Sequence, residues 1–145
     1  MTVKQYLKQI GSIQYKLERI RERLRMLNAD IDHIKSPDYG KDRIVSSASG
    51  DQMINMIIKC DEEYSELMRE QGRLLDARKK ICEEIEQLGD DRYKRILFER
   101  YVALRSWDEV ASVTGYDPTY VFDLHGKALD AFAHQHRKKL HLKTS

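Results

Sequence analysis

Two series of apolar residues, each repeating every seven positions, run through the first 34 residues of the chain. Their members are Val3, Ile10, Leu17, Leu24, Ile31 and Tyr6, Ile13, Ile20, Leu27, Ile34. The two series are offset by three positions, which is the a/d pattern of a coiled-coil helix. We therefore expect a helix over about residues 3–34. Because its apolar stripe is narrow, this helix must bury it against a partner helix.

A second amphipathic stretch, about residues 51–88, can supply that partner, with Asp51 as the expected N-cap. Its apolar positions alternate in steps of three and four, as in a second coiled-coil helix. Further apolar residues at Ile54, Met68, Leu75 and Cys82 make the stripe wider than one narrow partner covers. The surplus can contact the C-terminal domain or a second protomer, and we expect a homo-oligomer formed through this hairpin.

The stretch between the two helices, residues 35–50, contains the turn signal Ser36-Pro37-Asp38-Tyr39-Gly40 and a run of small residues. A connection there lets the two helices pack antiparallel, so we expect a first domain at 1–89 and a second at 90–145.

The charged fraction of 34% is typical of long exposed helices. No apolar run approaches the roughly 20 residues of a membrane span, and none resembles a signal peptide. These features favour an all-α cytoplasmic protein.

Residues 106–132 have the pattern of a helix-turn-helix, two short helices that cross closely around a tight turn. Ser106 and Glu109 can form a capping box at the start of the first helix, and Gly115 can end it in the left-handed conformation. Asp117 can cap the second helix, with Pro118 at its first position. An ordinary helical corner without a ligand remains the alternative.

Apolar residues at helical spacing should fill the core of this second domain. The first short helix should turn Val110, Ala111 and Val113 inward, and the second Val121, Leu124, Ala128, Leu129 and Phe132. A support helix over about residues 92–102 should add Ile96, Leu97, Tyr101 and Val102. Leu104 and Trp107 are expected to pack into the same core.

Charge is distributed unevenly along the chain. The net charge is +2 overall, but residues 51–90 carry −5 and residues 91–145 carry +3. A basic C-terminal block that includes a helix-turn-helix favours contact with double-stranded DNA. The tail after Phe132 contains Arg137, Lys138, Lys139 and Lys143. It can extend the last helix or fray, and it can attract phosphates or serve only to solubilise.

Catalytic and cofactor sites are not expected in this sequence. It has no glycine-rich phosphate loop and no nucleophile–base spacing. His134, His136 and His141 have no carboxylate or fourth ligand spaced with them, so we expect no metal site. Cys60 and Cys82, on one predicted helix, are too far apart to pair and should be reduced thiols.

Residues from about Arg95 to Phe132 resemble region 4 of the primary sigma factors. The shared elements are Arg100-Tyr101, Glu109-Val110-Ala111 and Lys127-Ala128-Leu129. With the two long helices before it, the whole layout is similar to the ArpU- and RinA-type late transcription regulators of bacteriophages and prophages. The resemblance implies a regulator that acts at a late-gene promoter, with or beside host RNA polymerase.

The predicted recognition helix departs from the sigma pattern where sigma factors read bases. Pro118, Thr119 and Asp123 stand where Arg, Glu and Gln are usual, and Phe122 replaces an arginine. Bidentate reading of guanine by arginine is therefore unavailable to this helix. We expect Thr119 and Tyr120 to contact bases and Lys127 to contact phosphate. Asp123 can accept from cytosine N4, but near phosphates it repels. The remaining candidate DNA-binding residues are Arg105, Arg100 and Ser106.

Three functional readings follow. The first is a DNA-binding transcriptional regulator that oligomerises through the hairpin. The second is a phage DNA-packaging or assembly adaptor of the small-terminase kind, although that kind usually places its DNA module at the N-terminus. The third is a protein-interaction module in which the helical corner is only a scaffold.

Overall fold

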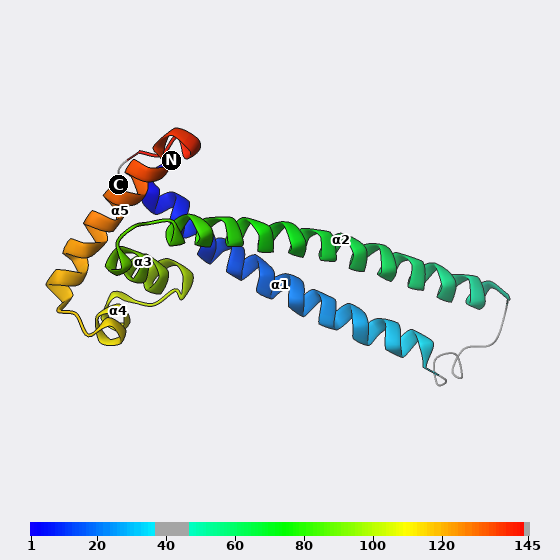
Figure 1. Ribbon diagram of the computed structural model, residues 1–145. Coiled ribbons are helices and arrows are strands. Elements are labelled where there is room, and N and C mark those ends of the chain that lie inside the picture. Colours follow the sequence, from blue (N-terminus) through cyan, green and yellow to red (C-terminus); the bar gives the residue numbers. More distant parts are fainter. Residues whose placement is uncertain (37–46, 144–145) are drawn as a thin grey trace. The chain divides into compact units, whose positions relative to one another are not determined.

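The computed structural model describes residues 1–36 and 47–143, and these residues fold into helices, as the sequence predicted. The elements in chain order are α1 (Val3–Lys35), α2 (Ser47–Glu86), α3 (Asp91–Leu97), the π-helical turn η1 (Phe98–Val102), α4 (Trp107–Thr114) and α5 (Pro118–Leu140) (Figure 1). The long helices α1 and α2 are antiparallel and in contact, which confirms the predicted pair. Within the described ranges, no helix combines the length and apolarity that crossing a bilayer requires.

The chain divides into two compact units, and the divisions fall inside the long helices. Unit 1 contains Met1–Gln14 and the chain from Leu75 onward, and unit 2 is Tyr15–Leu74. The sequence placed a division at residue 89, between the second long helix and the C-terminal block. The contacts instead group the first turns of α1 and the last turns of α2 with the C-terminal helices. The reason is that the ends of α1 and α2 pack on α5.

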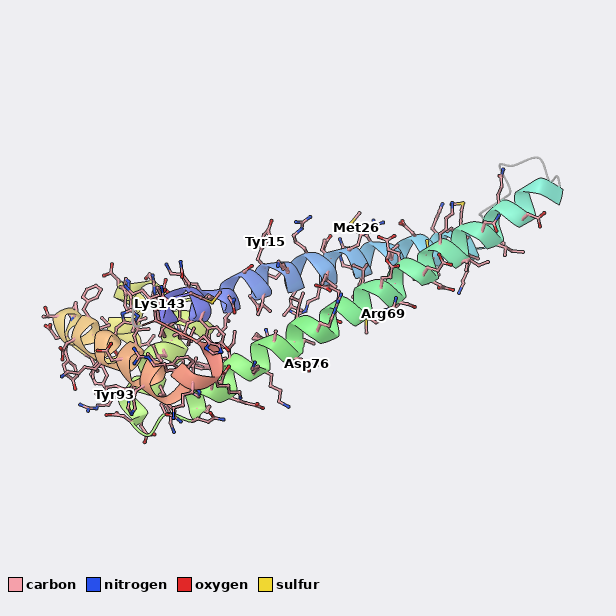
Figure 2. The ribbon with its side chains drawn as sticks, turned by 90° about the horizontal axis from the view of Figure 1, so that it is seen from above. Tyr15, Met26, Arg69, Asp76, Tyr93 and Lys143 are labelled. Atoms are coloured by element: carbon pink, nitrogen blue, oxygen red, sulfur yellow. The ribbon has the colours of Figure 1, made fainter. Side chains whose placement is uncertain are left out.

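Unit 2 is a pair of antiparallel helical segments, one from α1 and one from α2 (Figure 1). The predicted stripe of α1 is buried at Leu17, Ile20, Leu24, Leu27 and Ile34. The guanidinium of Arg23 makes two hydrogen bonds, 2.7 and 3.0 Å, to the carboxylate of Glu63 across the pair. Figure 2 shows Tyr15 and Met26 projecting from the side of α1 that faces away from α2, and both are exposed.

The prediction that Asp51 caps α2 is wrong, because the helix already begins at Ser47. A glycine inside a helix costs only about 1 kcal/mol relative to alanine. A helix of 40 residues can therefore continue through Gly50. At its other end α2 stops at Glu86, two residues before the predicted end. The predicted connection, residues 35–50, is shorter than expected at both ends, because α1 includes Lys35 and α2 begins at Ser47; residues 37–46 lie outside the described residues.

In unit 1 the two ends of the chain pack together. The ring of Tyr6 lies 6.0 Å from that of Phe132. Nε2 of His136 donates to the backbone oxygen of Glu84 at 3.0 Å. After α5, the backbone N–H groups of Lys143 and Val3 donate to the carbonyls of Met1 and Lys143 respectively, both at 3.1 Å. The basic tail therefore extends the last helix and then pairs with the N-terminus.

The predicted support helix is present as α3 followed by the π turn η1. Ile96, Leu97 and Tyr101 are buried, as expected. Val102 is only half-buried and Leu104 is 49% exposed, so the prediction that Leu104 fills the core is wrong. A π turn adds a residue to one helical turn and so rotates everything after it. The N–H of Ala103 donates to Phe98 O at 2.9 Å, five residues back, which marks that extra residue.

Candidate nucleic-acid interface

A small apolar core holds α3, α4 and α5 together. Its fully buried residues are Ile96, Val110, Val121 and Leu124. Partly buried Tyr93, Trp107, Ala111 and Tyr116 pack against them. Trp107 therefore serves as a packing residue, as predicted. This core fixes α5 with one side against α3 and α4.

Both ends of α4 form as the sequence predicted. Ser106 Oγ accepts from the Glu109 N–H at 3.2 Å, and Glu109 Oε2 accepts from the Ser106 N–H at 3.4 Å, which completes the capping box. Gly115 ends the helix with φ = 72°. This left-handed conformation is one that glycine adopts without steric cost. The chain therefore reverses within a few residues and enters α5.

The inward face of α4 differs from the prediction at one position. Val113 is 41% exposed, and Thr114 is buried in its place. Thr114 lies one helical turn after Val110, so both point toward the same side of α4. The Thr114 hydroxyl donates to Val110 O at 2.7 Å, which satisfies its polar group within the core. The assignment of Val113 to the core was therefore wrong.

The start of α5 also matches the prediction, but the helix is longer. Asp117 accepts from the Thr119 N–H at 2.9 Å as the N-cap, and Pro118 occupies the first turn. The helix continues past the predicted end at residue 132 to Leu140. The buried residues of α5 are Val121, Leu124, His125, Ala128, Leu129, Phe132, Ala133 and His136.

The four candidate DNA-binding residues of α5 are all exposed: Thr119, Tyr120, Asp123 and Lys127. With a rotation of about 100° per residue, the four side chains lie within an arc of about 100° around the helix axis, on the side opposite the buried residues. The structure thus brings these four predicted residues together on one outer face. We call these four residues the α5 outer face.

Two polar contacts set the electrostatics of the α5 outer face. Lys127 Nζ lies 3.0 Å from Asp123 Oδ2, one turn back along the helix. This hydrogen bond and the negative charge of Asp123 raise the pKa of Lys127. Arg92 of α3 donates to the Tyr120 hydroxyl at 2.9 Å and also pairs with Asp90 at 2.8 Å. Lys127, the cation of the α5 outer face, and its neighbour Arg92 are therefore each already paired with a carboxylate.

The remaining three predicted residues, Arg100, Arg105 and Ser106, come from η1 and the segment that leads into α4. Arg105 Nε donates to Glu99 Oε2 at 2.7 Å. Among the described residues no ion pair joins Arg100 to Glu109, whose carboxylate is held in the capping box. Arg100 instead donates to Arg105 O at 2.9 Å and lies over the Trp107 ring at 4.4 Å.

Two further surface features lie near these residues. Phe122 is 53% exposed, yet its ring centroid lies 5.1 Å from that of Trp107. Arg92, whose role was unassigned, is connected to the α5 outer face through Tyr120. The one sequence feature that pointed to Arg92 was a basic residue two positions after the Asp90 cap. The partner of Tyr120 depends on how α3 crosses α5, which the residue pattern does not fix.

No metal-binding group of three or more His, Cys, Asp or Glu side chains occurs in the described part of the chain. Of the three tail histidines, His136 is buried against α2, whereas His134 and His141 are exposed. Cys60 and Cys82 are free, half-buried thiols. Comparison of the chain with protein-family models, with curated proteins and with solved structures found no match.

Proposed function

We propose that this protein is a DNA-binding transcriptional regulator in which α4 and α5 act as a helix-turn-helix. The start of α5 lies against duplex promoter DNA in this proposal, and the protein binds without catalysing a reaction. Following the sequence resemblance to sigma region 4, we place it among phage or prophage regulators of late genes. It then acts in the bacterial cytoplasm, with host RNA polymerase as a further partner.

The proposal rests on one observation. The inner side of the corner between α4 and α5 packs against the core, and its outer side is exposed. The capping box, the left-handed Gly115 and the Asp117 cap fix the turn. Val121 and Leu124 anchor the inner side of α5, while the α5 outer face stays exposed. A recognition helix that enters a major groove needs one side packed on its own domain and the opposite side exposed.

The charges on this face favour weak recognition of the DNA sequence and a largely electrostatic contact with the DNA backbone. The Asp123 carboxylate pairs with Lys127 and also repels phosphates, so it opposes DNA binding by two routes. We therefore expect Lys127→Gln to weaken binding to duplex DNA and Asp123→Asn to strengthen it. Effects of opposite sign from two residues one turn apart are not expected of general unfolding.

The test is fluorescence anisotropy with a labelled duplex of about 20 base pairs, two turns of DNA, over a range of salt. For Lys127→Gln the slope of log affinity against log salt should fall by about 1. Lys80→Gln, on exposed α2, is the matched control and should leave the slope unchanged. If the wild-type protein binds no duplex at low salt, the proposal fails.

A protein-interaction module is a second candidate, favoured by the exposed ring of Phe122. The sequence resemblance suggests host RNA polymerase as the partner to test with purified components. Phe122→Ser should then weaken polymerase binding, whereas Val113→Ser, an exposed apolar residue of α4, should not. Polymerase binding by a protein that binds no DNA would favour this reading over the first.

We also propose that unit 2 self-associates, because α2 leaves apolar side chains uncovered. Ile54, Ile58 and Met68 are 54%, 48% and 43% exposed. They lie on one side of α2 by helical spacing, beside the acidic Asp61 and Glu62. Sedimentation equilibrium should give an oligomer for the wild type and a smaller species for Ile58→Glu. A wild-type monomer at all concentrations would exclude self-association.

A further inference from the structure

Unit 1 contains a groove of about 350 Å³ that does not involve the α5 outer face. Its lining residues are Lys8, Gly11, Arg100, Tyr101, Leu104 and Arg105. The first two belong to α1, and the other four belong to η1 and the segment after it. The groove therefore joins the first helix of the chain to the residues that lead into α4.

Positive charge dominates this groove. Lys8 is exposed and forms no ion pair with any described residue. Arg100 donates to a backbone carbonyl and stacks on Trp107, and no ion pair joins it to a carboxylate in the described part of the chain. Of the cations that line the groove, Arg105 alone pairs with a described acidic residue, Glu99. Lys4 lies one helical turn before Lys8, and its charge helps burial to lower the pKa of His125, as does that of Arg100.

The shape of the groove depends on two unusual backbone features. Leu104 has φ = 59°, a left-handed backbone conformation that residues other than glycine rarely adopt. Gly11 lies under the Leu104 side chain, and a Cβ at position 11 would stand 3.4 Å from Leu104 Cδ2. Backbone strain that a fold retains is concentrated at functional sites. Here the strained turn exposes Leu104 at one wall of the groove and keeps Arg100 and Arg105 beside Lys8.

We propose that this groove binds a phosphate of the nucleic-acid backbone, with Lys8 and Arg100 as its ligands, so that α1 contributes to the DNA interface. The inference rests on the proposed function and extends it to a helix that the sequence assigned to oligomerisation. Lysine offers a compact charge and arginine a planar set of donors, and both suit phosphate oxygens. Lys4 lies one turn away on α1 and can reach a neighbouring phosphate.

The position of Trp107 connects this groove with the corner. Its ring contacts Arg100, which lines the groove, and Phe122, which belongs to the exposed start of α5. In this proposal one duplex contacts both the start of α5 and the groove, which Trp107 links within the same unit. Contacts to the backbone position a protein on DNA without reading sequence. This role fits a protein whose recognition helix lacks arginine.

The experiment measures duplex affinity against salt for Lys8→Gln, Lys8→Arg and the pair Lys4→Gln with Lys8→Gln. Each cation that contacts phosphate should contribute about 1 to the slope of log affinity against log salt. The slope should fall by about 1 for Lys8→Gln, fall by about 2 for the double variant, and recover for Lys8→Arg. Lys80→Gln is again the control, and circular dichroism confirms that each variant is folded.

Three results would overturn the inference, and they are distinguishable. If Lys8→Gln keeps the wild-type slope while Lys127→Gln lowers it, the groove is not a phosphate site and the proposed function survives. If the wild type binds no duplex at low salt, both proposals fail together. Binding of polyglutamate in place of duplex, lost in Lys8→Gln, would assign the groove to an acidic protein partner and likewise overturn the nucleic-acid inference.

Discussion

The hydroxyl of Tyr101 lies 2.8 Å from Nε2 of His125, and the hydrogen bond between them is buried in unit 1. His125 is only 6% exposed, and the Trp107 ring meets it edge-on at 4.6 Å. Burial, together with the nearby charges of Lys4 and Arg100, lowers the pKa of His125 to about 4. The folded protein therefore holds this imidazole neutral at pH values where an unfolded chain would protonate it.

We expect this histidine to make folding stability depend on pH. The unfolded pKa is about 6.5, so between pH 6.5 and 4 the unfolded chain binds a proton that the folded chain does not. Stability should be fully present above pH 6.5 and be lost as pH falls toward 4. The loss is about 2 kcal/mol once solvent screening is allowed for. Urea unfolding at pH 7 and pH 5 measures the effect.

The control for this prediction is His125→Gln, which keeps a hydrogen-bonding group but does not titrate. Its unfolding free energy should change less between pH 7 and pH 5 than that of the wild type. Other groups titrate in both proteins, so only the difference between the two pH profiles reports on His125. Parallel profiles would contradict the assignment of the effect to this residue.

Gly115 and Gly126 should respond in opposite directions to replacement by alanine. Neither has an atom within 4 Å of the added Cβ, so packing does not differ. Gly115 has φ = 72°, and the left-handed conformation costs an alanine roughly 1–2 kcal/mol. Gly126 lies inside α5, where alanine is favoured by about 1 kcal/mol. Thermal unfolding should show a lower midpoint for Gly115→Ala and a higher one for Gly126→Ala.

The sequence predicted the features of this fold that arise from local chemistry. The a/d stripe of α1, the capping box at Ser106, the left-handed Gly115 and the Asp117 cap each depend on residues within a few positions of one another. The α5 outer face followed from the same helical period. Local signals of this kind are independent of how distant helices cross, so residue spacing is enough to read them.

The features that the sequence did not predict depend on helix crossings or on a single inserted residue. The π turn at Phe98–Val102 has no sequence signal, and it displaced Leu104 from the expected core. The groove beside Lys8 exists only because α1 passes the end of η1, more than 90 residues away along the chain. The burial of His136 against α2 likewise depends on the path of α5 after residue 132.

The pair formed by Tyr6 and Glu84 should be strongly coupled in stability. The Tyr6 hydroxyl donates to Glu84 Oε1, and burial together with this carboxylate raises the pKa of Tyr6. Glu84 is 2% exposed, and its other oxygen, Oε2, meets no donor among the described residues. Tyr6→Phe removes the one side-chain donor and should cost about 2 kcal/mol.

A double-mutant cycle tests whether that cost belongs to the pair. In a Glu84→Leu background there is no buried carboxylate to satisfy, so Tyr6→Phe should cost less than about 0.5 kcal/mol. Denaturant unfolding of the four proteins gives the coupling energy. Equal costs in both backgrounds would show that the Tyr6 hydroxyl stabilises the fold independently of Glu84.

The left-handed turn at Leu104 gives a further prediction, in which a glycine is stabilising. A leucine at φ = 59° carries a backbone cost of roughly 1–2 kcal/mol that glycine does not. Leu104 is 49% exposed, so its side chain contributes limited burial. Leu104→Ala removes the side chain and keeps the strain, whereas Leu104→Gly removes both. The glycine variant should therefore unfold at a higher denaturant concentration than the alanine variant, against the usual order of the two residues. The opposite ranking would mean that this turn is not held in the left-handed conformation in solution, and the wall that Leu104 provides for the groove would then have no fixed geometry.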